Sequence, residues 1–191
     1  MADKNTVSVQ DATVDGKLVG RDDNSTTFIT SYERSMYLEK LYEEFQKEKE
    51  TCPELKEMCS DLDYLNSQVE NDKVIGLEEK LKAGGRERIL DYATRMKEKF
   101  HKKLMLTSQY SNAAQDVNVY ILSKVQRGFM MDVYTLICNN ESEAKIDAMI
   151  DEKIIRPVKA ELGINLFKYD EGDIMGMIFF LTGNCHIKWT K

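Results

Sequence analysis

AAQDVNVYILSKVQRGFMMDVYTLIC, from Ala113 to Cys138, is the most apolar helical pattern in the chain. Its apolar residues recur every three or four positions, which is the period of an α-helix. They are Val117, Tyr120, Ile121, Val125, Phe129, Met130, Val133 and Ile137. Because these side chains cover more than one stripe of the helix surface, other helices must pack on several of its sides. The stretch therefore predicts a central helix in a mainly α-helical fold.

A second helical pattern follows this stretch, and its signals set its ends. Asn140 and Glu143 are expected to open it, and Gly163 is expected to end it in the left-handed conformation that favours glycine. Pro157 lies inside the pattern, where it removes a backbone hydrogen bond. The sequence therefore predicts either a kink at this point or two shorter helices. Residues 164–169 are expected to be extended.

The sequence ends on GMIFFLTGNCHIKWTK, Gly176 to Lys191, which is unusually apolar for a terminus. We expect Asp173 to cap a short helix over 174–181 that stops at Gly183, and residues 186–189 to leave as a tail. Trp189 has two interpretations: it either closes a core or fills a pocket on a partner.

Positive charge is concentrated on the N-terminal side of the central pattern, between Lys80 and Lys103, although the whole chain carries a net charge of −6. We expect a helix here after Gly84-Gly85, with Ile89, Ala93, Met96 and Phe100 facing inward. The cations could form a solvated, ion-paired face or could bind phosphates or an acidic partner. The candidate nucleic-acid contacts are Arg86, Arg88, Arg95, Lys99, Lys102 and Lys103.

A helical hairpin is predicted over 31–75. Its first helix ends near Glu50, with Leu38, Leu41, Tyr42 and Phe45 on one face, and Thr51 with Glu54 forms a capping-box signal for the second. Spacings of three and four then produce a heptad stripe, which suits one neighbouring helix from the same chain or from a second copy. We assign this stripe to a homo-oligomer interface made of Leu55, Met58, Leu62, Leu65 and Val69.

The first thirty residues differ from the helical remainder. They are rich in β-branched residues and contain turn signals at Asp15-Gly16 and at 20–24. They predict a short β-hairpin-like segment with strands near 6–9, 17–19 and 26–29. The expected organisation is thus a β-rich segment at 1–30, a helical hairpin at 31–75 and a helical domain at 76–191.

Catalytic signatures are scarce. The chain has no phosphate-binding loop, nucleophile elbow or zinc-protease motif, and only two histidines. A Cys185/His101 or Cys59/His186 couple is conceivable, but no spacing favours either, and the four cysteines form no CxxC pair. We therefore expect no enzyme, cofactor or metal. The longest apolar run is too short to cross a membrane, and reduced thiols are typical of a cytoplasmic protein.

The ending EGDIMGMIFFLTGNCHIKW, 171–189, resembles the C-terminal domains of bacterial ABC-three-component systems of the Lamassu-like anti-phage group. The resemblance extends back to about Lys97, through KLMLTSQYSNAAQDVNVYILSKVQRGFMMDVY. It implies a tether between an effector or sensing module and an SMC-like ABC ATPase with a middle component. The effector half typical of that family is absent here, so the resemblance implies only the tethering role.

The resemblance implies that Trp189, His186 and Lys188 face the ATPase assembly. It also implies that any contact with DNA is made by the assembled complex. DGKLVGRDDNSTTF has a weaker resemblance to β-peptides that precede bacterial conflict-system domains, which implies that Gly20, Arg21 and Asp22 recruit an effector; a plain hairpin is the alternative. The sequence thus predicts a non-enzymatic adaptor. A self-assembling helical scaffold without an ATPase partner and a small DNA-end-binding accessory protein are the alternatives.

Overall fold

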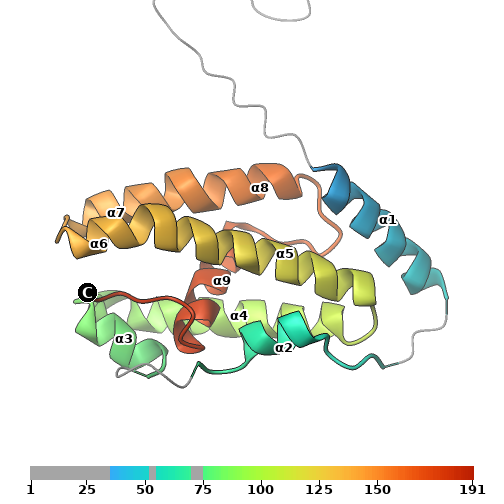
Figure 1. Ribbon diagram of the computed structural model, residues 1–191, viewed down its shortest axis with the longest axis horizontal. Coiled ribbons are helices and arrows are strands. Elements are labelled where there is room, and N and C mark those ends of the chain that lie inside the picture. Colours follow the sequence, from blue (N-terminus) through green and yellow to red (C-terminus); the bar gives the residue numbers. More distant parts are fainter. Residues whose placement is uncertain (1–34, 52–54, 70–74) are drawn as a thin grey trace, which may run out of the picture. The chain divides into compact units, whose positions relative to one another are not determined.

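The computed structural model describes residues 35–51, 55–69 and 75–191, all within one compact unit, Tyr32–Lys191. Regular structure in these ranges is entirely helical (Figure 1), which confirms the mainly α-helical class for them. The elements are α1 (Met36–Glu50), α2 (Ser60–Asn66), α3 (Leu77–Ala83), a 3₁₀ turn η1 (Glu87–Ile89), α4 (Leu90–Ser108), α5 (Asn112–Gly128), α6 (Tyr134–Cys138), α7 (Glu143–Ile150), α8 (Arg156–Leu162) and α9 (Glu171–Gly183). The predicted β-rich segment lies outside the described residues. None of the described helices combines the length and the apolar character that a membrane crossing requires.

The predicted central helix is confirmed as one continuous helical stretch. It begins at α5, where the Ser111 hydroxyl caps the helix by accepting a hydrogen bond from the Ala114 amide at 2.9 Å. It passes through a π-helical segment, η2 (Phe129–Val133), and continues as α6. The α5 part packs against α1, α2, α4, α8 and α9, which satisfies its several apolar sides.

The helix that follows has the same interrupted form. It begins at α7 with Ser142 as its N-cap, two residues later than expected, and Asn140 lies in the turn before it at a φ of 53°. A π-helical segment, η3 (Asp151–Ile155), precedes Pro157. Because proline lacks an amide proton and its ring clashes with the carbonyl four residues earlier, a widened turn lets the helix continue past it. Gly163 ends α8 at a φ of 52°, as expected.

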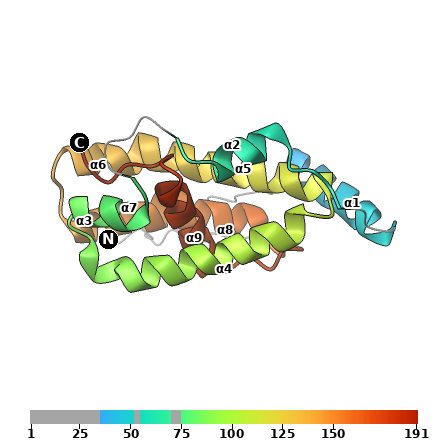
Figure 2. The ribbon, with the colours of Figure 1, turned by 90° about the horizontal axis from the view of Figure 1, so that it is seen from below.

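Helix α9 is apolar on every side and lies inside the helical unit. All five residues from Met177 to Leu181 are buried, and the helix contacts α3, α4, α5 and α8. Figures 1 and 2 show it crossing between α4 and the α5–α8 pair. It begins one turn earlier than expected, because Asp170 is the N-cap and Asp173 is the reciprocal residue of a capping box.

The helical hairpin is only partly confirmed. Helix α1 ends at Glu50 as expected, but the hydroxyl of Thr51 donates to the carbonyls of Lys47 and Glu48, so Thr51 closes α1 rather than opening a second helix. The second helix begins only at Ser60.

The predicted heptad stripe is wrong as one continuous helix. Gln115 on α5 binds the backbone of the preceding segment: its amide nitrogen donates to the Glu57 carbonyl at 2.9 Å, and its side-chain oxygen accepts from the Cys59 amide at 2.6 Å. These bonds hold the segment in a non-helical form, and Leu55 is 76% exposed. Leu62 and Leu65 are buried in the core of the same chain. The homo-oligomer interface stays a prediction, but these five residues cannot form it as one stripe on a continuous helix.

The capping box of α9 makes a prediction about acid stability. Lys99 donates to both carboxylate oxygens of Asp170, at 2.9 and 2.7 Å, and the Asp173 amide donates to the same carboxylate at 2.9 Å. Burial raises the pKa of Asp170, but these hydrogen bonds and the charges of Lys99 and Lys103 outweigh it and lower the pKa to about 2. Because the pKa in the unfolded chain is about 3.9, the stabilisation is present above about pH 4 and is lost as the pH falls towards 2.

Asp170→Asn should therefore destabilise the protein at neutral pH, and this effect should shrink markedly as the pH falls to about 2. The difference should not exceed about 1 kcal/mol, since the Asp170 side chain is 61% exposed. Urea unfolding of both proteins at several pH values measures it. A difference that stays constant down to about pH 2 would contradict the role of the carboxylate charge.

Candidate partner-binding site

His186 lies in the interior rather than on a partner-facing tail. Its Nε2 atom is 3.1 Å from the Tyr64 carbonyl oxygen and 3.2 Å from that of Ser67, and its ring meets the Tyr64 ring edge-on. Burial lowers the pKa of His186, so the neutral imidazole can donate one proton to these carbonyls. His186 therefore holds the C-terminal end of α2 against the segment that follows α9.

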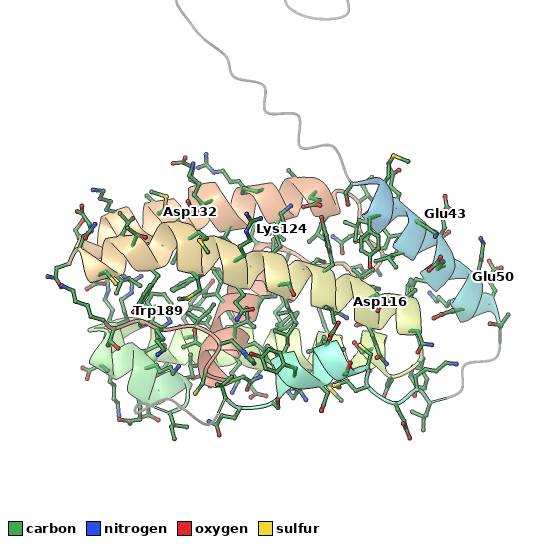
Figure 3. All side chains as sticks on the ribbon, in the orientation of Figure 1. Glu43, Glu50, Asp116, Lys124, Asp132 and Trp189 are labelled. Carbon is green, nitrogen blue, oxygen red and sulfur yellow. The ribbon has the colours of Figure 1, made fainter. Side chains whose placement is uncertain are left out.

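Trp189 is also part of the core, at 4% exposure. Its indole N–H donates to the Thr182 hydroxyl at 3.0 Å, its ring packs on Phe129, and the Arg86 guanidinium lies 5.3 Å from the ring centroid. Figure 3 shows Trp189 among the side chains between α3 and α6. Of the three residues expected to face the ATPase assembly, only Lys188 is exposed. The terminal string thus closes the domain, the first of the two interpretations of Trp189.

The cysteine–histidine couples are not assembled in the described residues. His101 stacks on Phe180, and His186 binds two backbone carbonyls at the end of α2. Neither imidazole is hydrogen-bonded to Cys59 or Cys185 in the part of the chain that the structure describes. Within the same ranges no group of three or more histidine, cysteine or acidic residues has a metal-binding geometry.

The basic stretch is largely neutralised by acidic residues of the same chain. Arg86 is buried and pairs with Glu143 and Asp147, and Arg88 pairs with Glu143 at 2.6 Å. Lys99 pairs with Asp170 and Asp173, and Lys103 with Asp173. Arg95 and Lys102 are exposed and make no ion pair with another described residue. The ion-paired alternative thus accounts for most of the stretch, and nucleic-acid contact stays a prediction.

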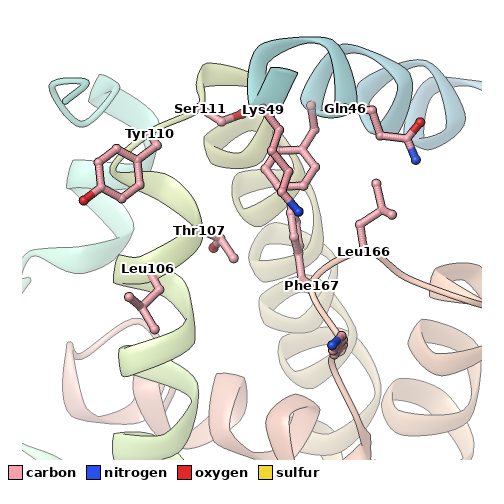
Figure 4. Close-up of a pocket in the computed structure, with 10 residues that line it drawn as sticks. Gln46, Lys49, Leu106, Thr107, Tyr110, Ser111, Leu166 and Phe167 are labelled. Carbon is pink, nitrogen blue, oxygen red and sulfur yellow. The ribbon is translucent and has the colours of Figure 1, made fainter. Parts of the chain in front are cut away.

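An apolar pocket opens where α1, the end of α4 and the loop 163–170 meet; we call it the α1–α4 pocket. Its volume is about 460 Å³, within the range of about 300–1,000 Å³ typical of ligand pockets. Figure 4 shows side chains from all three elements around it. The lining residues are Phe45, Gln46, Lys49, Leu106, Thr107, Tyr110, Ser111, Leu166, Phe167 and Lys168.

Aromatic rings form the inner wall of the α1–α4 pocket. The Phe167 ring packs edge-on against three other rings, in the arrangement that aromatic quadrupoles prefer. The distances between ring centroids are 5.0 Å to Phe45, 5.9 Å to Tyr42 and 5.5 Å to Tyr169. The hydroxyl of Tyr169 donates a hydrogen bond to the side-chain oxygen of Asn118 at 2.8 Å, which fixes the position of the Tyr169 ring. This wall is fixed by packing and does not depend on a ligand.

The loop that supplies one side of the pocket is held by polar contacts. The Asn165 side chain accepts from the Tyr169 amide at 2.7 Å and donates to its carbonyl at 3.0 Å, while Lys103 donates to the Lys168 carbonyl at 2.8 Å. Lys168 consequently adopts a φ of 54°, which is uncommon for a residue other than glycine. The expectation of an extended segment at 164–169 is wrong, because these contacts fold it into a loop.

The rim of the α1–α4 pocket exposes apolar side chains to solvent. Leu106 is 66% exposed, and Tyr110 and Leu166 are about two-fifths exposed. Exposed apolar side chains that surround one pocket are candidates for contact with a partner. Sequence reasoning missed it because Leu106 reads as part of a helix face and Leu166 as part of a strand. Only the fold brings them together with α1.

A family model matches residues 76–189, more than half of the chain: C-terminal domain 9 of the ABC-three component (ABC-3C) systems. The match runs from the residue before α3 to Trp189, so α1 and α2 precede it. No curated protein and no solved structure matches the chain.

Proposed function

Since the chain belongs to the family of C-terminal domain 9 of the ABC-three component systems, we propose that it is a non-enzymatic adaptor that docks on other components of such a system through the α1–α4 pocket. Membership makes those components its partners. The SMC-like ABC ATPase and the middle component implied by the sequence resemblance are the docking partners in this proposal. Anti-phage defence in the cytoplasm, with an effector recruited by residues 20–22, is its cellular context.

The observation that carries the docking site is the exposure of Leu106 beside an aromatic wall. A leucine that is two-thirds exposed gains little from folding, whereas covering it with a partner removes apolar surface from water. The terminal string cannot serve this purpose, because Trp189 and His186 are already covered by their own chain. The lining of the pocket also comes both from the region that matches the family and from α1, which precedes that region.

Leu106→Glu should weaken binding to the other components of the system while leaving the fold intact. A charge in a desolvated contact costs about 2 kcal/mol or more, which is about a 30-fold loss of affinity. Co-purification of the full chain with the co-expressed components, followed by titration, measures the effect.

Met131 provides a matched control. It is 67% exposed and lies on η2, away from the α1–α4 pocket. Met131→Glu introduces the same charge at an equally exposed apolar position and should bind like the unmodified chain. Equal binding by Leu106→Glu and Met131→Glu would count against docking at this pocket.

A further inference from the structure

The charged residues at the α1–α4 pocket are all positive. Its lining contains Lys49 and Lys168 and no carboxylate, although acidic residues outnumber basic ones in the chain by 33 to 27. Neither lysine makes an ion pair with another described residue, in contrast to most cations of the basic stretch. These two charges are therefore available to a ligand.

The outer face of α4 adds one further cation, Lys102, beside the rim of the pocket; beyond it, the exposed carboxylate of Glu98 lies on the same face, between Lys102 and Arg95. Arg95, Lys102 and Leu106 are spaced by seven and four residues, so they lie on one face of the helix. Both cations are exposed and lack an ion pair among the described residues. At 1.5 Å per residue, the face extends for about 16 Å from Arg95 to the leucine at the rim of the pocket.

We infer that the α1–α4 pocket binds a protein segment that carries a large apolar side chain flanked by carboxylates. The apolar side chain would lie against Leu106 and the aromatic wall, and the carboxylates would pair with Lys49 and Lys168 and, along α4, with Lys102. This inference rests on the proposed function and adds the chemistry of the partner to it.

A protein segment fits the pocket better than a nucleic acid does. Phe167, the ring at the centre of the inner wall, is buried and meets Phe45 and Tyr169 edge-on, so it offers little surface for base stacking. The net charge of −6 opposes a polyanion over most of the surface. A short acidic segment with an apolar side chain contacts only the positive rim and the apolar interior of the pocket, so the negative charge of the remaining surface opposes its binding less.

The test uses the full chain with the co-expressed components of its system and the double variant Lys49→Glu/Lys168→Glu. Reversing these two charges should weaken binding about tenfold or more at about 0.05 M salt, and the loss should shrink at about 0.5 M salt because of screening. The matched control is Arg127→Glu/Lys191→Glu, which reverses two exposed cations that lie outside the α1–α4 pocket and make no ion pair with another described residue; it should bind normally. Thermal melting verifies that each variant is folded.

Four outcomes of these measurements distinguish the inference about the acidic segment from the proposed docking site. Weaker binding by both Leu106→Glu and the lysine double variant, with normal controls, supports the inference. Weaker binding by Leu106→Glu alone overturns the acidic chemistry but leaves the docking site in place. Unimpaired binding by Leu106→Glu, or the absence of any complex, overturns both. If the chain alone binds labelled duplex DNA, and the lysine variant loses that binding but still binds the protein components, the occupant is nucleic acid and the inference fails.

Discussion

Trp189→Ala should lower the free energy of unfolding by about 3–5 kcal/mol, the cost typical of truncating a buried aromatic residue. The indole fills space beside Phe129, and its N–H satisfies the buried Thr182 hydroxyl. Removing it also uncovers the guanidinium of Arg86. For a unit of this size the melting temperature should fall by about 6–20 °C, as measured by calorimetry or circular dichroism.

The neighbouring Lys188→Ala is the control, because Lys188 is exposed and should change stability by less than about 0.5 kcal/mol. Trp189→Phe should recover part of the loss, since it keeps an aromatic ring but not the hydrogen bond. A Trp189→Ala protein that melts normally and no longer binds its system partners would support the partner-facing interpretation of this residue instead.

Gly176→Ala should destabilise the protein by about 1–3 kcal/mol or more, the cost of overpacking a core. A Cβ atom at this position would lie 2.4 Å from the Met96 carbonyl oxygen and 2.7 Å from the Phe100 Cβ atom. Both belong to α4, so the substitution must push α4 and α9 apart. Denaturant unfolding measures the cost.

Gly172→Ala in the same helix separates this clash from the general effect of replacing glycine. Its Cβ atom would meet the Asp170 carboxylate at 3.1 Å and the Met96 sulfur at 3.2 Å, and these side-chain ends can move. Alanine is favoured over glycine in a helix by about 1 kcal/mol, so Gly172→Ala should be near neutral. Equal effects at the two positions would contradict the close contact between α4 and α9.

The helices could be predicted where apolar periodicity is long. The stretch 113–138 and the helix after Gly84-Gly85 both form where expected, because their patterns bury one or more complete faces. The stripe from Leu55 to Val69 failed, because a side chain from another element, Gln115, competes for the backbone of its first residues. Local spacing contains no information about such a competitor.

The candidate site was predicted poorly, and the reason lies in long-range packing. Apolar residues near a terminus suggest a surface for partners, yet Trp189 packs on Phe129 of η2 and binds Thr182 of α9, and His186 binds backbone carbonyls at the end of α2. The α1–α4 pocket combines residues from three distant parts of the sequence, none of which is distinctive alone. The resemblance to C-terminal domains of ABC-three-component systems is confirmed, since residues 76–189 match that family model, whereas the Lamassu-like assignment stays a prediction.

The hydrogen bonds between the segment after α2 and the end of the chain also bear on how the protein is made. The Val69 amide donates to the Asn184 carbonyl, and the Asn184 side chain donates to the Leu65 carbonyl. A ribosome that adds about 5–20 residues per second reaches Asn184 about 6–23 s after Val69. Until then α2 lacks these partners and α9 is absent from the core. The apolar surfaces that α9 covers therefore stay exposed until α9 has been translated, and we expect the nascent chain to need chaperone protection until then.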